Sequence, residues 1–192
     1  MSAALSKGER TRADIVECAR RLFYEHGYDG TSFSAIVEAS GLVRGNIYHY
    51  FKSKDDILKA VVAQHLDEFS ALLARWERES TDPKQRLLAF IDMVTGRRND
   101  LVKYGCPIGT LNSELAKDRR DLQQGARALF DLFRTWLAAR FTEMGQPPAA
   151  ADALALHLLG RAQGIALIAH VYRDAKLLQQ ETAVLQDWVK QL

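Results

Sequence analysis

The 192-residue sequence has little of what marks membrane, secreted or highly charged proteins. It has no run of 18 or more apolar residues, so a membrane-spanning helix is not expected. The start of the chain lacks an apolar segment and does not resemble a secretory signal. Two cysteines, Cys18 and Cys106, are too few for a disulfide framework and fit a reducing cytoplasm. The net charge of +2 indicates nucleic-acid binding only if cations cluster locally.

Motifs for catalysis and metal binding are also missing from the sequence. There is no Gly-x-Ser-x-Gly, no phosphate-binding loop and no His-Glu-x-x-His. Cys106 and a histidine could form a Cys–His pair, but no known signature surrounds them, so an enzyme is a weak alternative. We therefore expect no cofactor and no metal site, because the five histidines are scattered. They are His26, His49, His65, His157 and His170.

Apolar residues recur at helical spacing along the whole chain, and no long stretch alternates with period two. The pattern predicts an all-α protein of about nine helices. A short three-helix head precedes a larger helical bundle, so we expect one domain boundary, with a head over 1–55 and a helical body over 56–192. The helices are expected at 9–26, 33–40, 44–50, 53–80, 83–102, 107–116, 119–144, 149–172 and 179–191.

Residues 33–50 have the pattern of a helix-turn-helix, with two short helices joined by a tight turn at Gly41. In this arrangement the second helix enters the DNA major groove. Val43, Ile47 and Phe51 are spaced by four, so we expect them to share a face that turns inward. The stretch from Val43 to Lys54 contains three cations and no anion, which is a local basic patch hidden by the overall charge.

The other side chains of this stretch are candidates for DNA contacts. Arg44 can bind guanine N7 and O6 with both arms, and Tyr48 can reach a thymine methyl group or a phosphate. His49 is a further candidate, and Gly45 has no side chain to keep the helix backbone from the DNA. The polar residues that suit phosphate oxygens are Thr31, Ser32, Asn46, Tyr50 and Lys54. The alternative is a helix-turn-helix that binds protein, with the tyrosines covering a core.

An ordered series of residues resembles the DNA-binding head of the TetR family of bacterial transcriptional regulators. The resemblance covers about a third of the chain, and one position departs from it. The family usually has Ser or Thr where this chain has Val43, and loss of that helix cap costs about 1 kcal/mol. The matching residues are Ile15, Ala19, Leu22, Phe23, Gly27, Tyr28, Thr31, Ser32, Ile36, Gly45, Tyr48, Tyr50, Phe51, Lys54 and Leu58.

The resemblance implies a homodimer formed through the last two helices, and the sequence allows one. The segment 154–172 is apolar almost all round, and Gly160 and Gly164 would let a second helix approach closely. The alternative is a helix buried at the centre of a monomer. The expected interface residues are Leu158, Gly160, Ala162, Gly164, Ile165, Ile168, Leu185 and Trp188.

The resemblance also implies a small-molecule effector bound among the helices of the bundle. An aromatic and apolar lining is typical of small-molecule sites, so an apolar or aromatic effector is expected, although each residue alone could simply fill the core. Cys106 stands at the start of a short helix, and some regulators of this type sense electrophiles or oxidants through a similar cysteine. The candidate lining residues are Phe69, Trp76, Phe90, Met93, Tyr104, Cys106, Leu111, Phe130, Phe133, Trp136, His157 and Tyr172.

Together these patterns and the resemblance imply a ligand-responsive DNA-binding regulator in the cytoplasm, with a helix-turn-helix DNA-binding domain over 1–55 and a ligand-binding and dimerisation domain over 56–192. We expect it to bind a palindromic operator as a homodimer and to be released by a small-molecule effector, and a repressor is favoured over an activator. Its expected partners are double-stranded DNA, the effector and a second copy of itself, with no membrane. The alternatives are a protein-interaction module, a thiol-based sensor acting through Cys106, and a small-molecule enzyme.

Overall fold

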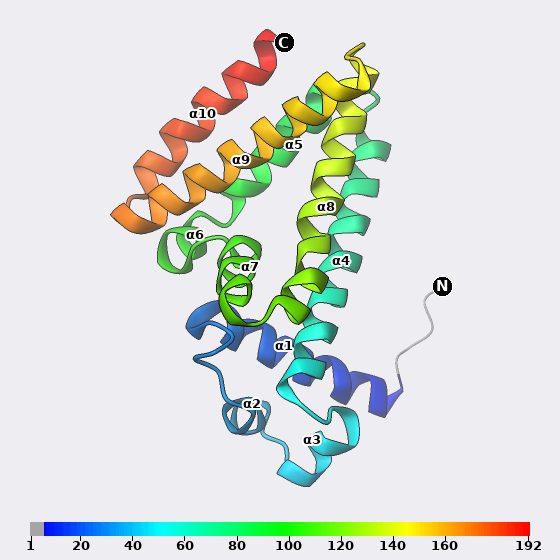
Figure 1. Cartoon of the computed structure of the whole chain (residues 1–192), viewed down its shortest axis with the longest axis vertical. Helices are drawn as coiled ribbons and strands as arrows, with labels where there is room; N and C mark the ends of the chain where they lie inside the picture. The colour runs from blue at the N-terminus through cyan, green and yellow to red at the C-terminus, as the bar shows by residue number, and fades with distance from the viewer. Residues whose placement is uncertain (1–5) are drawn as a thin grey trace. The chain divides into compact units, whose positions relative to one another are not determined.

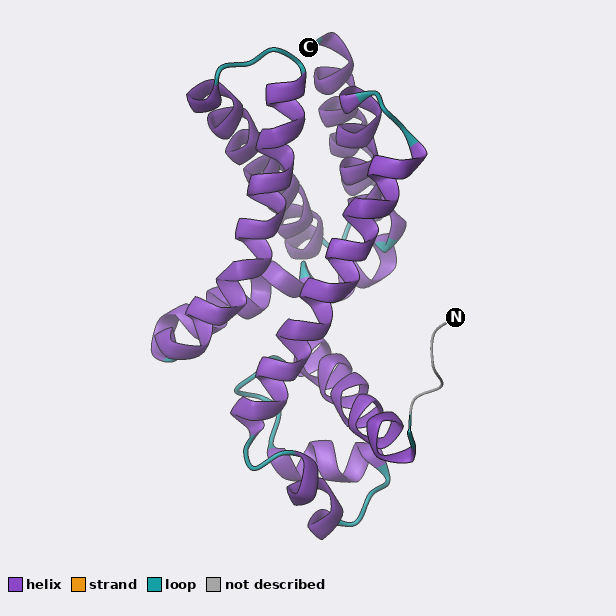
Figure 2. Cartoon of the chain, turned by 90° about the vertical axis from the view of Figure 1, so that its right-hand side faces the viewer, coloured by secondary structure: helices purple, strands orange, loops and turns teal. Residues whose placement is uncertain are grey.

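The computed structural model describes residues 6–192, except for the side chains of Arg44, Val94 and Thr95. This part of the chain consists of helices and short loops and contains no strand (Figure 2). The prediction of an all-α fold is confirmed. The helices are α1 (Lys7–His26), α2 (Phe33–Ser40), α3 (Arg44–Tyr50), α4 (Lys54–Glu79), α5 (Pro83–Gly96), α6 (Arg98–Tyr104), α7 (Pro107–Asp118), α8 (Arg120–Glu143), α9 (Pro148–Tyr172) and α10 (Ala175–Gln191).

The largest departures from the helix bounds that the sequence predicts lie in two places. The expected helix over 83–102 is two helices, because Gly96 is a weak helix former and Arg97 leaves the helical region at φ −117° and ψ 33°. The last helix begins earlier than expected, since the Asp174 carboxylate accepts hydrogen bonds from the backbone N–H groups of Lys176 and Leu177. Local caps and single backbone dihedrals therefore set the bounds that periodicity misses.

The chain forms two compact units. The first contains residues 6–65 together with Leu111–Arg127, and the second contains Leu66–Thr110 together with Ala128–Leu192. The first turns of α4, the end of α7 and the first turns of α8 thus pack with the head, and the functional boundary after residue 55 stays a prediction.

The first unit is built around apolar residues of α1, α2, α3 and the start of α4 (Figure 1). Ile15, Ile36, Ile47 and Ile57 are completely buried in it. Removing such side chains from water supplies about 1.5–3 kcal/mol each, which favours one fixed arrangement of these short helices. The turn between α2 and α3 passes through Gly41 at φ +66°, a conformation that glycine adopts without strain.

The second unit has an aromatic core between α4, α5 and α8. The ring of Phe133 lies 5.0 Å from that of Phe69 and 5.5 Å from that of Phe90, measured between ring centroids. Trp76 and Trp136 form a second pair at 5.7 Å. In the same unit α10 runs alongside α9 (Figure 1).

Candidate nucleic-acid interface

Helix α3 is fixed to the first unit by two of the three residues that the sequence predicts to face inward. Ile47 and Phe51 are buried, whereas the side chain of Val43 is 73% exposed. Val43 is the N-cap residue, with φ −67° and ψ 138°, so its backbone is extended and helical spacing does not apply to its side chain. The prediction that Val43 turns inward is therefore wrong.

The opposite side of α3 is open. Gly45, Asn46, Tyr48 and His49 are exposed, and Tyr50 is half-buried. A Cβ atom built on Gly45 would meet no atom within 4 Å. The first turn of α3 therefore presents bare backbone to the outside, which the close approach of a nucleic acid requires. The side chain of Arg44, the expected reader of guanine, lies outside the described part of the structure.

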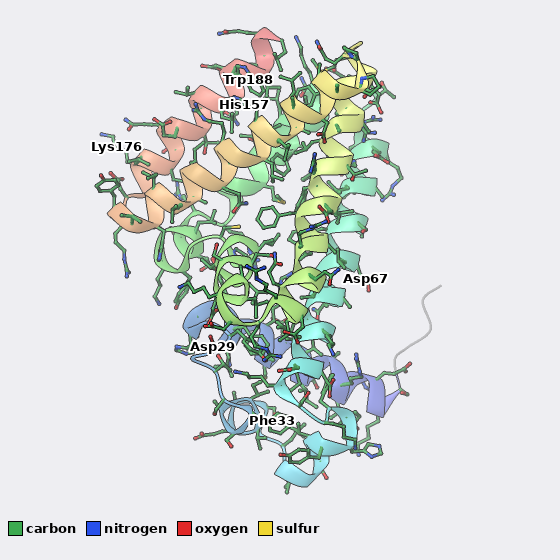
Figure 3. The ribbon with its side chains drawn as sticks, in the orientation of Figure 1. Asp29, Phe33, Asp67, His157, Lys176 and Trp188 are labelled. Carbon is green, nitrogen blue, oxygen red and sulfur yellow. The ribbon has the colours of Figure 1, made fainter. Side chains whose placement is uncertain are left out.

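The ring of Tyr48 is held in place by α2. It stacks on Phe33 with ring centroids 4.9 Å apart and an interplanar angle of 27°, and Phe33 is labelled in Figure 3. The Lys52 ammonium group donates a hydrogen bond to the carbonyl of Tyr48 at 2.6 Å. The ring stays partly exposed, so Tyr48 is positioned before any partner arrives, which lowers the entropy cost of binding.

Two of the expected phosphate contacts have other partners in the structure. Thr31 is 2% exposed, and its hydroxyl group donates to the carbonyl of Gly27 at 2.7 Å. The Lys54 ammonium group donates to the carbonyl of Tyr28 at 2.7 Å and lies 3.9 Å from the centre of that ring. Both side chains stabilise the turn after α1. The buried Thr31 is therefore corrected to a structural residue, whereas a phosphate contact of the half-buried Lys54 stays a prediction.

Ser32 remains exposed at the start of α2. Its hydroxyl oxygen accepts a hydrogen bond from the N–H group of Ala35 at 3.0 Å, so Ser32 is the N-cap of α2. The N-terminus of α2 keeps the partial positive charge that favours a phosphate.

The start of α1 is a basic segment beside α3 that is not among the DNA contacts predicted from the sequence. Lys7 and Arg10 are exposed, and the Arg12 guanidinium lies 4.9 Å from the centre of the Phe51 ring at the end of α3. A Cβ atom on Gly8 would lie 3.9 Å from the Tyr50 hydroxyl group. The signal was present in the sequence as "KGERTR", but only the fold brings this segment beside α3.

Most of the expected effector-lining rings meet in the second unit. Phe69, Phe90, Trp76, Phe133 and Trp136 form its aromatic core. Four more expected residues of this unit are half-buried: Met93, Tyr104, Cys106 and Phe130.

Three expected effector contacts are not part of this core. Leu111 belongs to the first unit, and His157 and Tyr172 are exposed on α9, Tyr172 to 69%. His157 instead faces Trp188 of α10, with ring centroids 5.0 Å apart (Figure 3). Leu111 is corrected because it packs in the first unit, and His157 and Tyr172 because helical periodicity does not tell which side of the apolar helix α9 turns inward.

The expected dimer residues divide into two sets. Four of them are buried within the protomer and are corrected from interface to core: Leu158, Ala162, Ile165 and Leu185. Gly160 and Gly164 lie on the exposed side of α9, where a Cβ atom on either would meet nothing within 4 Å. A groove of about 490 Å³ runs along this side between α9 and α10. It is lined by Leu156, His157, Gly160, Arg161, Gly164, Ile165, Ile168, Leu177 and Glu181.

The exposed side of α9 is strongly apolar. Leu167, Ile168, Val171 and Tyr172 are all exposed there. Among the described residues α9 is also the one helix long and apolar enough to cross a membrane, with a mean hydropathy of 1.3 over 18 residues. That test rests on length and composition alone, and a helix that packs on one side and pairs on the other passes it as well. Trp188 is half-buried beside this face.

Cys106 immediately precedes α7. Its sulfur accepts a hydrogen bond from the N–H group of Gly109 at 3.5 Å, and the side chain is half-buried. Among the described residues, no group of three or more His, Cys, Asp or Glu side chains is placed to hold a metal ion.

Comparison with known proteins assigns both parts of the chain. Residues 15–61 match the bacterial regulatory proteins of the tetR family, and residues 83–183 match the LmrA/YxaF-like transcriptional regulator C-terminal domain. The HTH-type transcriptional regulator Rv0196 of Mycobacterium tuberculosis is 31% identical over 178 residues, which is 88% of this chain and 87% of that protein. The HTH-type transcriptional repressor AcnR of Corynebacterium glutamicum is 40% identical over 62 residues, 32% of this chain and 33% of that protein.

Solved structures agree with this assignment. A TetR transcriptional regulator from Chloroflexus aurantiacus superposes with a TM-score of 0.84 at 27% identity, over 97% of this chain and 98% of that one. These relatives are transcriptional regulators rather than enzymes, in agreement with the prediction. The chain belongs to the TetR family of bacterial DNA-binding transcriptional regulators.

Proposed function

We propose that the protein is a repressor that binds a palindromic operator as a dimer and leaves it when a small-molecule effector binds. The open backbone at Gly45 is the observation that carries the proposal, because it leaves room for DNA against the first turn of α3. Arg44, Tyr48 and His49 read bases from this helix. Ser32, Asn46, Tyr50 and the α1 residues Lys7 and Arg10 bind the phosphate backbone.

The dimer forms through the exposed side of α9 and the edge of α10. Exposed apolar side chains and two open glycines support this, since large apolar patches mark interaction surfaces and small residues permit close helix approach. A two-fold dimer matches a palindromic operator, with recognition helices about 34–36 Å apart. The interface residues that stay in the proposal are Gly160, Gly164, Ile168 and Trp188.

The effector binds in the second unit against its aromatic core, which supports an apolar or aromatic molecule. Helix α4 has residues in both units, so a shift of this helix reaches the head. The effector must bind the non-operator form more tightly, because a ligand moves an equilibrium only by its differential affinity. Among the relatives, AcnR is a repressor by name, which supports repression. The protein acts in the cytoplasm, where its DNA is.

A steric variant of α3 tests the operator contact. Gly45→Leu adds a side chain where the free protein has open space, so the melting temperature should hold while sequence-specific DNA binding falls at least tenfold. Gly125→Leu is the matched control, because Gly125 is another open helical glycine of the first unit. Equal DNA affinity of Gly45→Leu and Gly125→Leu in a gel-shift assay would reject the proposed orientation of α3.

A further inference from the structure

The turn from α7 into α8, residues 114–121, belongs to the first unit and contains none of the binding residues predicted from the sequence. Glu114 of this α7–α8 corner lies beside the loop that follows α1. Its two carboxylate oxygens accept hydrogen bonds from the backbone N–H groups of Tyr28, at 2.9 Å, and Asp29, at 2.8 Å. Asp29 is labelled in Figure 3. One carboxylate thus satisfies two neighbouring backbone donors that no helix supplies with acceptors.

Gly27 shows how closely the corner approaches this loop. It has φ +77°, and a Cβ atom there would lie 3.0 Å from both carboxylate oxygens of Glu114. Backbone strain and lack of space therefore both favour glycine at position 27.

Arg119 makes the second connection of the corner, to the start of α4. Its guanidinium donates to the Asp55 carboxylate at 2.5 Å and to the Tyr28 hydroxyl oxygen at 3.3 Å. The Tyr28 hydroxyl group itself donates to Asp55. The hydrogen bond from Arg119 lowers the pKa of Asp55 below its usual range, whereas burial and then Asp55 raise the pKa of Tyr28. The Tyr28 hydroxyl group thus stays protonated and donates to Asp55, and the Asp55 carboxylate stays charged and accepts from both Tyr28 and Arg119.

The two connections stand at the two ends of the helix-turn-helix. Tyr28 and Asp29 precede α2 by a few residues, and Asp55 follows α3 by a few residues. The three residues that the proposed function assigns to base reading, Arg44, Tyr48 and His49, lie between these two points of the chain. These two points of the chain therefore connect α2 and α3 to the α7–α8 corner.

These contacts bear more on geometry than on stability. The side chains of Arg119 and Asp55 are about one third exposed, at 32% and 35%, and ion pairs open to water contribute little to folding free energy. The geometry is nonetheless specific, since Arg119 binds Asp55 and Tyr28 at once and Glu114 binds two adjacent amides.

We propose that Glu114 and Arg119 are positioning residues for DNA binding, which hold both ends of the helix-turn-helix in the arrangement that fits the operator. The inference rests on the proposed function, in which α3 reads the operator.

Hydrogen exchange measured by mass spectrometry tests the positioning without any DNA. Arg119→Gln and Glu114→Gln should speed amide exchange in residues 27–32 and in the first turn of α4, while the exchange of α9 and α10 stays unchanged. Arg120→Gln is the matched control, because it removes the same charge from the next, exposed position of the corner. Exchange equal to that of wild type in both variants would overturn the proposal, whether or not the protein binds an operator.

A double-mutant cycle on DNA affinity tests the consequence, using a fragment that wild type binds. Arg119→Gln and Asp55→Asn should each weaken binding about tenfold, and the double variant should bind no worse than the weaker single variant. Arg120→Gln should weaken DNA binding by less than Arg119→Gln, since it removes only a positive charge. Losses that add in the double variant, or an equal loss in Arg120→Gln, would mean that general charge and not positioning sets the affinity.

Discussion

Val43, the N-cap residue of α3, makes no side-chain hydrogen bond to the helix, and we expect a substitution that supplies one to stabilise the protein. Three other helices begin with a serine whose hydroxyl oxygen accepts a hydrogen bond from the N–H group three residues on. Ser32 of α2 does so from φ −84° and ψ 156°, close to the backbone of Val43 at φ −67° and ψ 138°. Val43→Ser should therefore place its oxygen at the first turn of α3 without backbone movement.

The magnitude follows from the exposure of the site. Val43 is 73% exposed, so its removal gives up only a small apolar contact. A serine cap in place of alanine is worth about 1 kcal/mol, and for a protein of this size about 1 kcal/mol corresponds to a melting shift of about 2–4 °C. Val43→Ala is the reference variant, because it loses the same methyl groups as Val43→Ser and gains no acceptor.

Thermal and urea unfolding followed by circular dichroism measure the difference between the two variants. We expect Val43→Ser to be more stable than Val43→Ala by about 1 kcal/mol, and to bind operator DNA at least as tightly as wild type because α3 is better formed. Equal stability of the two variants would show that the backbone at position 43 does not present a cap site, and would refute the reasoning.

Three further predictions concern other parts of the molecule. Gly164→Leu should shift sedimentation from dimer to monomer, whereas the Gly125→Leu control stays dimeric; a dimeric Gly164→Leu would contradict the α9 interface. Alkylation of Cys106 should leave operator affinity unchanged in a gel shift, and a large loss would instead favour thiol sensing. The pKa of Asp55 is lowered in the folded protein, so its charged form makes a small contribution to stability at neutral pH, and this contribution is lost as the pH falls below about 4. The stability advantage of wild type over Asp55→Asn should accordingly shrink on acidification, and a pH-independent difference would count against the pair with Arg119.

Sequence periodicity was sufficient for most of the fold. The bounds of α2 and α3 agree with the expected ones, because Ser32 and Gly41 are local signals that act through the backbone of their own segment. Buried and exposed positions followed the pattern where one face of a helix was polar, as for Ile47 against Asn46. Local sequence information was enough in these places.

The remaining features depend on residues that are distant in the chain. Lys54 carries a charge that suits phosphate, but the fold directs it to the carbonyl of Tyr28, 26 residues away. The contact of Glu114 with Tyr28 spans 86 residues and has no counterpart in any local pattern. On α9 the apolar residues surround the helix, so periodicity could not separate the buried Leu158 from the exposed Ile168.

The most direct test of the account is the binding of α3 to a specific DNA site. Fluorescence anisotropy should compare a fragment from upstream of the protein's own gene with a shuffled fragment of equal length. Wild type should bind the upstream fragment more tightly than the shuffled one. Arg44→Ala and Tyr48→Ala should each reduce this difference in binding free energy by about 1–3 kcal/mol. Arg75→Ala, an exposed arginine of the second unit, should lose none. Undiminished specificity in both α3 variants would contradict the assignment of α3 as the reading helix.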